Sequence, residues 1–249
     1  MTRVPAAALR RAATLAAGFL LVAGLAHVPA DADDTTPDAL AGAPAVGSCY
    51  DLTLKDGFEH SVPKEPIDCA ADHTTVVIEV GTLTTGLTWS SSEKAIGKDV
   101  GAQCGAAFSA KVGSKPAQLM YSQYTWFWFE PTDAEKAAGA RWFSCHLAAV
   151  EDRALGDLPD VLPRAGRNLP DALARCFVGR KYVQTTCADR HDWRLEFAVV
   201  VHQKPTPKNI DRADHRICPH HVSTRTWLRS AVPLDRRSFV LGCSSKTHH

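Results

Sequence analysis

Two short motifs in this 249-residue chain combine a cysteine with a histidine at the same spacing. Cys69 precedes His73 and Cys187 precedes His191 in a shared C-A-x-x-H pattern, and apolar residues follow each motif. A thiolate and an imidazole are both good Zn²⁺ ligands, so the spacing is compatible with a metal site. In an oxidising compartment the cysteines would instead form disulfides, and each histidine would form a hydrogen bond within its turn. The destination of the chain therefore decides between the two chemistries.

The N-terminal segment predicts export. Residues 1–11 contain three arginines and no acidic residue, and an apolar stretch from Ala12 to Ala26 follows. This pattern is typical of a signal peptide, and the small residues up to Ala32 indicate cleavage there, which removes residues 1–32. The apolar stretch, about 15 residues, is short for a helix that spans a bilayer. We expect a secreted or cell-envelope protein, with anchoring by an uncleaved N-terminal segment as the alternative.

Export favours disulfides for the eight cysteines. The chain also contains no C-x-x-C pair, which structural zinc sites commonly use. We predict no metal, no other cofactor and no catalytic thiolate. A Cys/His metal-binding protein is the alternative, and His215, His220 and His221 near Cys218 belong to it.

The cysteines form two sets of four with the same order of neighbours. Each set begins with a cysteine followed by an aromatic residue and continues with the C-A-x-x-H cysteine; the third lies in a predicted helix and the fourth ends the set. We predict the pairs Cys49–Cys69, Cys104–Cys145, Cys176–Cys187 and Cys218–Cys243, while other pairings are also compatible with the sequence. The shared order indicates an internal repeat.

The repeat defines the expected organisation. Repeat 1 covers residues 46–150, and a shortened repeat 2 covers residues 172–247. Residues 151–171 contain three prolines and are predicted to be a linker, while the acidic, Pro- and Ala-rich residues 33–45 are predicted to be disordered. The expected fold class is α+β, in which each repeat is a mostly antiparallel sheet with a packed helix, stabilised by disulfides.

Periodicity locates the elements of repeat 1. Alternation and β-branched content predict strands over residues 48–54, 66–69, 74–83 and 141–150. The third of these is nearly continuously apolar and is expected in a central position. Apolar residues at three- and four-residue spacing predict a helix over residues 92–112 with Cys104 towards the core. Thr132 and Glu135 form a capping box that begins a short helix.

The aromatic run over residues 121–129 is the main candidate for a binding surface. On a strand, Tyr124, Trp126 and Trp128 would lie on one face, and Phe127 and Phe129 on the other. We predict a central strand buried between the helix and the neighbouring repeat. The alternative is an exposed tryptophan face that stacks on glycan rings or packs on a protein partner. His73 and His191 complete the candidate surface.

Several segments of repeat 1 resemble the actinobacterial septum formation domain family. They are Val46-Gly47-Ser48-Cys49-Tyr50, the C-x-x-x-H strand end, Cys104-x-x-Ala107-Phe108 leading to Val112-Gly113, Pro131, and Gly139-Ala140-Arg141-x-x-x-Cys145. The family usually has proline where this chain has Asp72, and an acidic residue where Val76 stands. The resemblance spans most of residues 46–150 and implies an association with the cell envelope and division septa.

Basic and acidic residues are distributed unevenly along the chain. The full chain has 28 basic and 27 acidic residues, a formal net charge of +1 that gives no reason to expect nucleic-acid binding. After cleavage, residues 33–150 have 8 basic and 15 acidic residues, or −7, and residues 151–249 have 17 and 11, or +6. The basic repeat 2 is therefore expected to face an anionic envelope polymer or membrane, or to dock on repeat 1.

These observations predict an exported, non-enzymatic binding or structural module of the cell envelope. The expected partners are cell-wall glycan, an anionic envelope polymer, or envelope and division proteins. The chain lacks the G-x-S-x-G, H-E-x-x-H and phosphate-loop motifs of common hydrolases and NTPases. The alternative is an extracytoplasmic enzyme acting on wall polymer, with a carboxylate pair drawn from Asp72, Glu79 and Glu130.

Overall fold

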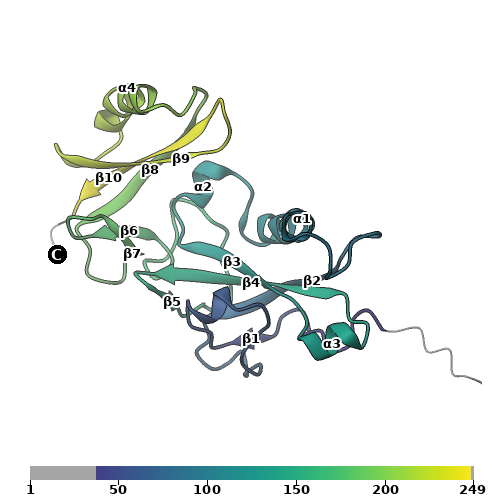
Figure 1. Cartoon of the computed structure of the whole chain (residues 1–249). Helices are drawn as coiled ribbons and strands as arrows, with labels where there is room; N and C mark the ends of the chain where they lie inside the picture. Colours follow the sequence, from purple (N-terminus) through teal and green to yellow (C-terminus); the bar gives the residue numbers. More distant parts are fainter. Residues whose placement is uncertain (1–37, 248–249) are drawn as a thin grey trace, which may run out of the picture. The chain divides into compact units, whose positions relative to one another are not determined.

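The computed structural model describes residues 38–247 of the chain (Figure 1). The predicted signal peptide and its cleavage position lie outside these residues. The described part has an α+β fold with two five-stranded antiparallel sheets, few helices and four disulfides. Within it, no helix is both long and apolar enough to cross a bilayer.

The first sheet has the strand order β1-β2-β4-β3. Its strands are β1 (Cys49–Tyr50), β2 (Thr75–Thr82), β3 (Tyr124–Phe129) and β4 (Trp142–Glu151), and β5 (Ala154–Gly156) pairs with the end of β4. Helix α1 (Glu93–Val112) connects β2 to β3. Because β2 and β3 are both antiparallel to β4, they are parallel to each other, and β2–α1–β3 is a β-α-β unit split by β4.

The second sheet has the order β7-β6-β8-β10-β9. Its strands are β6 (Arg175–Val178), β7 (Val183–Thr186), β8 (Trp193–Val201), β9 (Trp227–Pro233) and β10 (Phe239–Lys246). Helix α4 (Pro207–Ile217) and the 3-10 turn η2 (Cys218–His220) connect β8 to β9. If the hairpin strand β7 is left out, the strands of the second sheet have the same order along the chain and across the sheet as those of the first. The helix also comes at the same point, between the second and the third strand.

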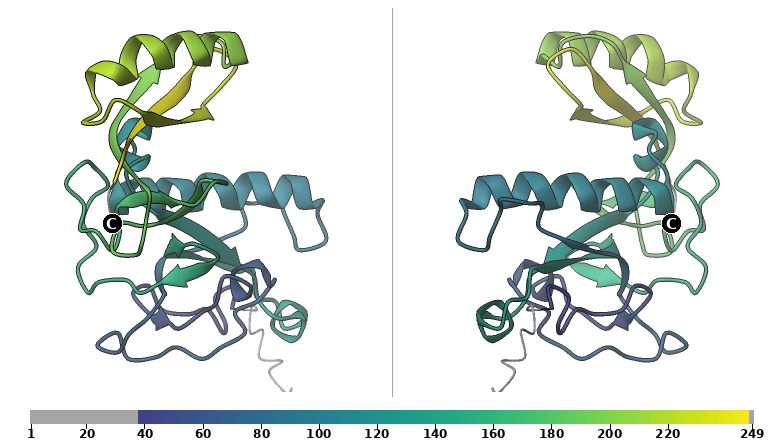
Figure 2. Two further views of the ribbon diagram at one scale, coloured as in Figure 1. Left: turned by 90° about the vertical axis from the view of Figure 1, so that its left-hand side faces the viewer. Right: turned by 90° about the vertical axis from the view of Figure 1, so that its right-hand side faces the viewer.

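Helix α1 covers one face of the first sheet (Figure 2). Its buried residues recur every four positions and are Ile96, Val100, Cys104, Phe108 and Val112. The helix predicted over residues 92–112 is confirmed, with Ser92 as its N-cap. Gly113 follows the helix with a φ of 110°, a backbone conformation that side chains disfavour. The shorter helices are η1 (Asp56–Phe58), α2 (Pro116–Leu119) and α3 (Asp133–Ala137), and α3 has the predicted capping box.

The four disulfides are the predicted pairs. Cys49–Cys69 joins β1 to the segment before β2, with a Cα–Cα distance of 5.3 Å. Cys176–Cys187 joins β6 to the segment before β8, with a Cα–Cα distance of 5.0 Å. Cys104–Cys145 joins α1 to β4, and Cys218–Cys243 joins η2 to β10, both with a Cα–Cα distance of 5.4 Å. The connecting helix is thus fixed to its sheet in both halves of the chain.

Three local predictions were wrong. Residues 48–54 form a strand only at Cys49–Tyr50, and residues 66–69 form a single bridge between Ile67 and Cys49, because Pro63 and Pro66 provide no N–H for a ladder. Residues 38–45, expected to be disordered, form turns held against the start of β4. There the Arg141 N–H donates to the Ala39 carbonyl, and the Trp142 indole N–H donates to the Ala41 carbonyl at 2.9 Å.

The central position predicted for residues 74–83 is confirmed, because β2 pairs with both β1 and β4. The strand predicted over 141–150 is confirmed as β4, whose residues are almost all buried. The predicted linker contributes more than a connection: its residues 154–156 form β5, and Leu158, Ala165 and Leu169 are buried in a core shared with both sheets.

The segment between α2 and β3 joins the two halves. Ser122 pairs with Ala174 in an isolated antiparallel bridge, and the Gln123 side chain donates to the Thr185 carbonyl. Met120 packs with Leu195 and Val240 of the second sheet. Residues 120–123 therefore belong structurally to both halves.

Candidate functional site

The aromatic run forms strand β3, which lies at the edge of its sheet. The prediction of a central strand was wrong: within residues 38–247, β3 pairs with β4 and with no other strand. The reason is the split β-α-β topology, in which β4 takes the central place between β2 and β3. Side-chain alternation reports which face a residue occupies and carries no information on neighbouring strands.

Both faces of β3 are nevertheless packed. Tyr124 is buried beside Phe108 and Val112 of α1, while Trp126 and Trp128 are partly buried against the core formed by α1. On the opposite face, Phe129 is fully buried and Phe127 packs against the same cluster. The predicted division of the aromatic residues between two faces is confirmed, and the tryptophan face is half-covered by α1.

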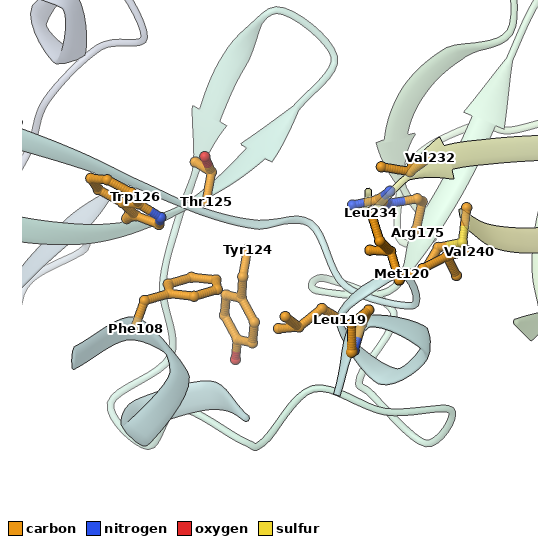
Figure 3. Close-up of a pocket in the computed structure, with 11 residues that line it drawn as sticks. Phe108, Leu119, Met120, Tyr124, Thr125, Trp126, Arg175, Val232, Leu234 and Val240 are labelled. Carbon is orange, nitrogen blue, oxygen red and sulfur yellow. The ribbon is translucent and has the colours of Figure 1, made fainter. Parts of the chain in front are cut away.

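A first hollow of about 320 Å³ lies at the start of β3, where the two halves meet (Figure 3). It is mostly apolar and is lined by residues of α1, α2, β3, β6, β9 and β10: Phe108, Pro116, Leu119, Met120, Tyr124, Thr125, Trp126, Arg175, Val232, Leu234 and Val240. Figure 3 shows Trp126 and Thr125 at one end, and Val232 and Leu234 at the other. Although both are apolar, Val232 and Leu234 are 48% and 41% exposed.

Two polar side chains of this hollow, those of Tyr124 and Arg175, already have partners. The Tyr124 hydroxyl donates to the Pro163 carbonyl at 3.0 Å, and burial raises the pKa of this phenol. The Arg175 guanidinium donates twice to the Ser122 carbonyl, at 2.6 and 3.1 Å, and burial lowers its pKa to about 10. The hollow therefore offers apolar contact and few unused hydrogen-bonding side chains.

A second hollow of about 380 Å³ lies further along β3. The segment Gly57–His60 forms one side, and Trp126, Phe127 and Trp128 form the other. Phe58 is 75% exposed, and its ring meets the Phe127 ring edge-on with centroids 6.0 Å apart. Trp126 lines both hollows, so the two hollows adjoin at this residue and both lie along β3.

The outer backbone edge of β3 is open between these hollows. At its far end, the Glu130 N–H points away from β4 and donates to the His60 carbonyl at 2.8 Å. In an antiparallel pair, successive residues direct their N–H and C=O groups alternately towards and away from the partner. Trp126 and Trp128 have the same phase as Glu130, so their backbone groups point outwards too.

The two ends of the site differ in charge. Leu234 of the first hollow also lines a wider depression of about 770 Å³ with Lys204, Arg236 and Arg237. Asp235 is in this depression as well, and its carboxylate accepts a hydrogen bond from the Arg237 N–H at 2.6 Å. At the other end, Glu130 is paired with Lys136 at 2.7 Å and His60 at 3.3 Å. The site is thus basic beyond the first hollow and charge-balanced beyond the second.

His73 and His191 do not join this surface. Both are 4% exposed, and their Nδ1 atoms lie 3.0 and 2.7 Å from the carbonyls of Ala71 and Asp189, two residues earlier in each turn. We assign Nδ1 as the protonated donor in each case, since a carbonyl only accepts. These two histidines bond within the turns of the C-A-x-x-H motifs and lie outside both hollows.

The alternative of a zinc site has no thiolate ligands among the described residues. Cys69 and Cys187 are both bonded to another cysteine, and no cysteine of the described part is a free thiol. Within residues 38–247 there is also no group of three histidine, cysteine or acidic side chains arranged to hold a metal ion. Asp72, Glu79 and Glu130 lie on separate elements: a turn, strand β2 and the end of β3.

Sequence reasoning missed one close pair of carboxyl groups. Glu151, at the end of β4, shares a hydrogen bond with Asp189, in the turn before β8. That hydrogen bond, together with burial and the negative charges of Asp189 and Asp157, raises the pKa of Glu151 to about 7. The same bond and the hydroxyl groups of Thr186 and Thr185 lower the pKa of Asp189. The pair joins residues from the two halves, which no local pattern reveals.

Comparison of the chain with models of protein families, with curated proteins and with solved structures finds no match. The resemblance of residues 46–150 to the septum formation family consequently stays a prediction.

Proposed function

We propose that this protein is an exported binding module of the cell envelope that acts without catalysis. The observation that carries the proposal is the position of Trp126, half-buried at an open sheet edge and shared by two neighbouring hollows. Large aromatic side chains in partly open, mostly apolar hollows are typical of binding surfaces. The four disulfides, typical of proteins outside the cytosol, support the predicted export.

We further propose that the two halves are related repeats. Both sheets place their first, second, fourth and third main strands in that order and connect the second to the third through a helix. Both have one disulfide before the second main strand and one between the helical segment and the last strand. In both, a buried histidine donates to the carbonyl two residues earlier. Duplication of one ancestral unit explains these shared features together.

The motifs of repeat 1 lead us to propose an envelope role of the septum formation type. Wall glycan, an anionic envelope polymer, and an envelope or division protein are the partners within this proposal. An anionic polymer would engage the basic residues Lys204, Arg236 and Arg237, which lie at one end of the site.

Incubation of the oxidised chain beginning at residue 33 with purified envelopes tests the proposal. We expect the protein to sediment with the envelopes and to release no soluble wall fragments. Trp126→Ala should lower the retained fraction about tenfold, because truncation of a buried aromatic anchor typically removes much of the binding energy. Val161→Ser is the matched control, since Val161 is exposed and apolar but lies outside both hollows.

Thermal unfolding of each variant shows whether it is folded. Release of wall fragments would instead identify an enzyme. Equal retention of folded Trp126→Ala and wild type would exclude this site as the binding surface.

A further inference from the structure

We infer that β3 binds an extended polypeptide segment, which adds to its outer edge as a further strand and places apolar side chains in the two hollows. This inference rests on the proposed binding function and names the class of partner. Its three supports are the open backbone edge, the two hollows beside it, and the polar groups that the site leaves unused.

The backbone edge is the first support. Strand β3 has a partner strand on one side only within residues 38–247, and the outward N–H and C=O groups of Trp126 and Trp128 follow the phase set by Glu130. A row of such groups is a template for another strand. Proteins that bind peptides by strand addition obtain affinity from these main-chain hydrogen bonds and specificity from pockets for alternate side chains.

The hollows are the second support. Side chains of an added strand alternate between the two faces of the sheet. The first hollow contains Phe108 and Tyr124, from the α1 side. The second contains Phe58 and Phe127, from the opposite side, and reaches Trp126 and Trp128 across the edge of β3. A segment of about six residues, at ~3.3 Å per residue, is long enough to pass along β3 and reach both hollows.

The polar groups favour a polypeptide over a glycan. A sugar brings many hydroxyl groups that need partners, and buried hydroxyl groups without partners cost binding energy. In the first hollow, however, the Tyr124 hydroxyl is bonded to Pro163 and the Arg175 guanidinium to Ser122. The Trp126 and Trp128 rings are also partly covered by the α1 core, which limits stacking on a sugar face. Among the described residues that line the hollows, the donor side chains that have no partner are the Thr125 hydroxyl and the indole N–H groups of Trp126 and Trp128, which are few for the many hydroxyl groups of a sugar. The outward backbone groups of β3 form a regular row, and a peptide backbone matches that row.

Charge complementarity predicts an acidic residue at one end of the ligand. The basic depression adjoins the first hollow through the shared residue Leu234, and it contains Lys204, Arg236 and Arg237 against one acidic residue, Asp235. The far end of β3 is balanced by the pairing of Glu130 with Lys136 and His60. The preferred segment therefore has alternating apolar residues and an acidic residue at the end that lies over the first hollow.

Selection of short random peptides on the oxidised full chain, followed by methylation of single backbone nitrogens, tests this inference. An added strand directs every second N–H towards β3. Methylation of those nitrogens should weaken binding about tenfold or more, whereas methylation of the intervening ones should leave the affinity within about twofold. Selected sequences should alternate apolar residues and carry an acidic end.

Protein variants locate the bound peptide without disturbing the core. Leu234→Ser should weaken binding of selected peptides several-fold, and Val161→Ser, at a second exposed apolar residue, should not. The double substitution Arg236→Glu and Arg237→Glu should abolish the preference for an acidic end, whereas Arg212→Glu, on the exposed side of α4, should preserve it.

The outcomes separate the inference from the proposed function. Failure to select any peptide, or binding that is insensitive to the position of the methyl group, overturns strand addition. If the protein is then still retained by envelopes through Trp126, the binding function stands with a partner of another class, and a β-1,4-linked N-acetylglucosamine oligomer tests the glycan. If neither envelopes nor peptides bind, both the function and the inference fail.

Discussion

Glu151 and Asp189 share one hydrogen bond across the contact between the two halves of the chain. Glu151 ends the central strand of the first sheet, and Asp189 belongs to the turn that precedes the longest strand of the second. Two carboxyl groups bond in this way only while one of them keeps its proton. We assign this proton to Glu151, because the pKa of Glu151 is raised while that of Asp189, which also accepts hydrogen bonds from Thr186 and Thr185, is lowered.

We predict that stability declines as pH rises through 7 because of this pair. The pKa of Glu151 is raised from 4.5, so the folded state keeps a proton that the unfolded state releases, and the contribution is complete below about pH 4.5 and lost above about pH 7. Glu151→Gln should remove this slope and stabilise the protein by about 1 kcal/mol at pH 8, after allowance for solvent screening. Urea unfolding at pH 5 and pH 8 measures it. The exposed Glu59→Gln is the control, and equal slopes for all three proteins would contradict the prediction.

The buried His146 should produce a slope of opposite sign at lower pH. Its ring lies between Tyr50 and Phe129, and burial lowers its pKa from 6.5 to about 3. Below pH 6.5 the unfolded state therefore binds a proton at this histidine, while the folded state does not bind it until about pH 3. As the pH falls from 6.5 to 3, the free energy of unfolding should decrease by up to about 1.4 kcal/mol per pH unit. His146→Phe should flatten this slope in urea unfolding series. His60→Gln, at an exposed histidine, should follow the wild type; a steep slope in His146→Phe would exclude this residue as its origin.

The disulfides should differ in their contribution to stability. Cys104–Cys145 closes a loop with a sequence separation of 41 residues, and Cys176–Cys187 closes one of 11. Loop entropy predicts that replacing the first pair by alanines costs about 1 kcal/mol more than replacing the second. All four cysteines are buried, so their burial is matched. Guanidinium unfolding of the two double variants measures the difference, and a larger loss for Cys176–Cys187 would show that strain or packing outweighs chain entropy.

Two glycines should respond to alanine in opposite directions. A Cβ at Gly242, in β10, would lie 2.6 Å from Ser230 Oγ and 2.9 Å from both Leu195 Cδ1 and Met120 Cε. Gly242→Ala should therefore destabilise the protein by about 1 to 3 kcal/mol through overpacking. Gly105, in α1, has open space at this position, so Gly105→Ala should stabilise by up to about 1 kcal/mol. Melting temperatures measure both, and stabilisation by Gly242→Ala would contradict the packing described for this contact.

The cysteine pairs and helix α1 were predictable because their signals repeat or are local. The order of neighbours around each cysteine occurs twice, and the four-residue spacing from Ile96 to Val112 defines a helix face. The edge position of β3 was not predictable, because it depends on β4, a later segment, entering the sheet between β2 and β3.

The candidate site was predictable only in part. Trp126 and Trp128 were found by their type and alternation, but the first hollow needs Arg175, Val232 and Leu234 from the other half of the chain. The repeated C-A-x-x-H spacing marks His73 and His191 as candidate residues, whereas in the structure the Nδ1 atom of each contacts a carbonyl of its own turn.

The shared segment at residues 120–123 has a consequence for the order in which the newly made chain completes its structure. The first half leaves the ribosome before the second, yet the Gln123 N–H donates to the Leu173 carbonyl and the Tyr121 carbonyl accepts from the Arg175 N–H. The apolar surface of Met120 is likewise covered only when Leu195 and Val240 of the second half pack against it. A fragment that ends near residue 150 would still pair β3 with β4, but it would leave the outer backbone edge of residues 121–123 and the Met120 side chain uncovered, which is a template for association with other chains.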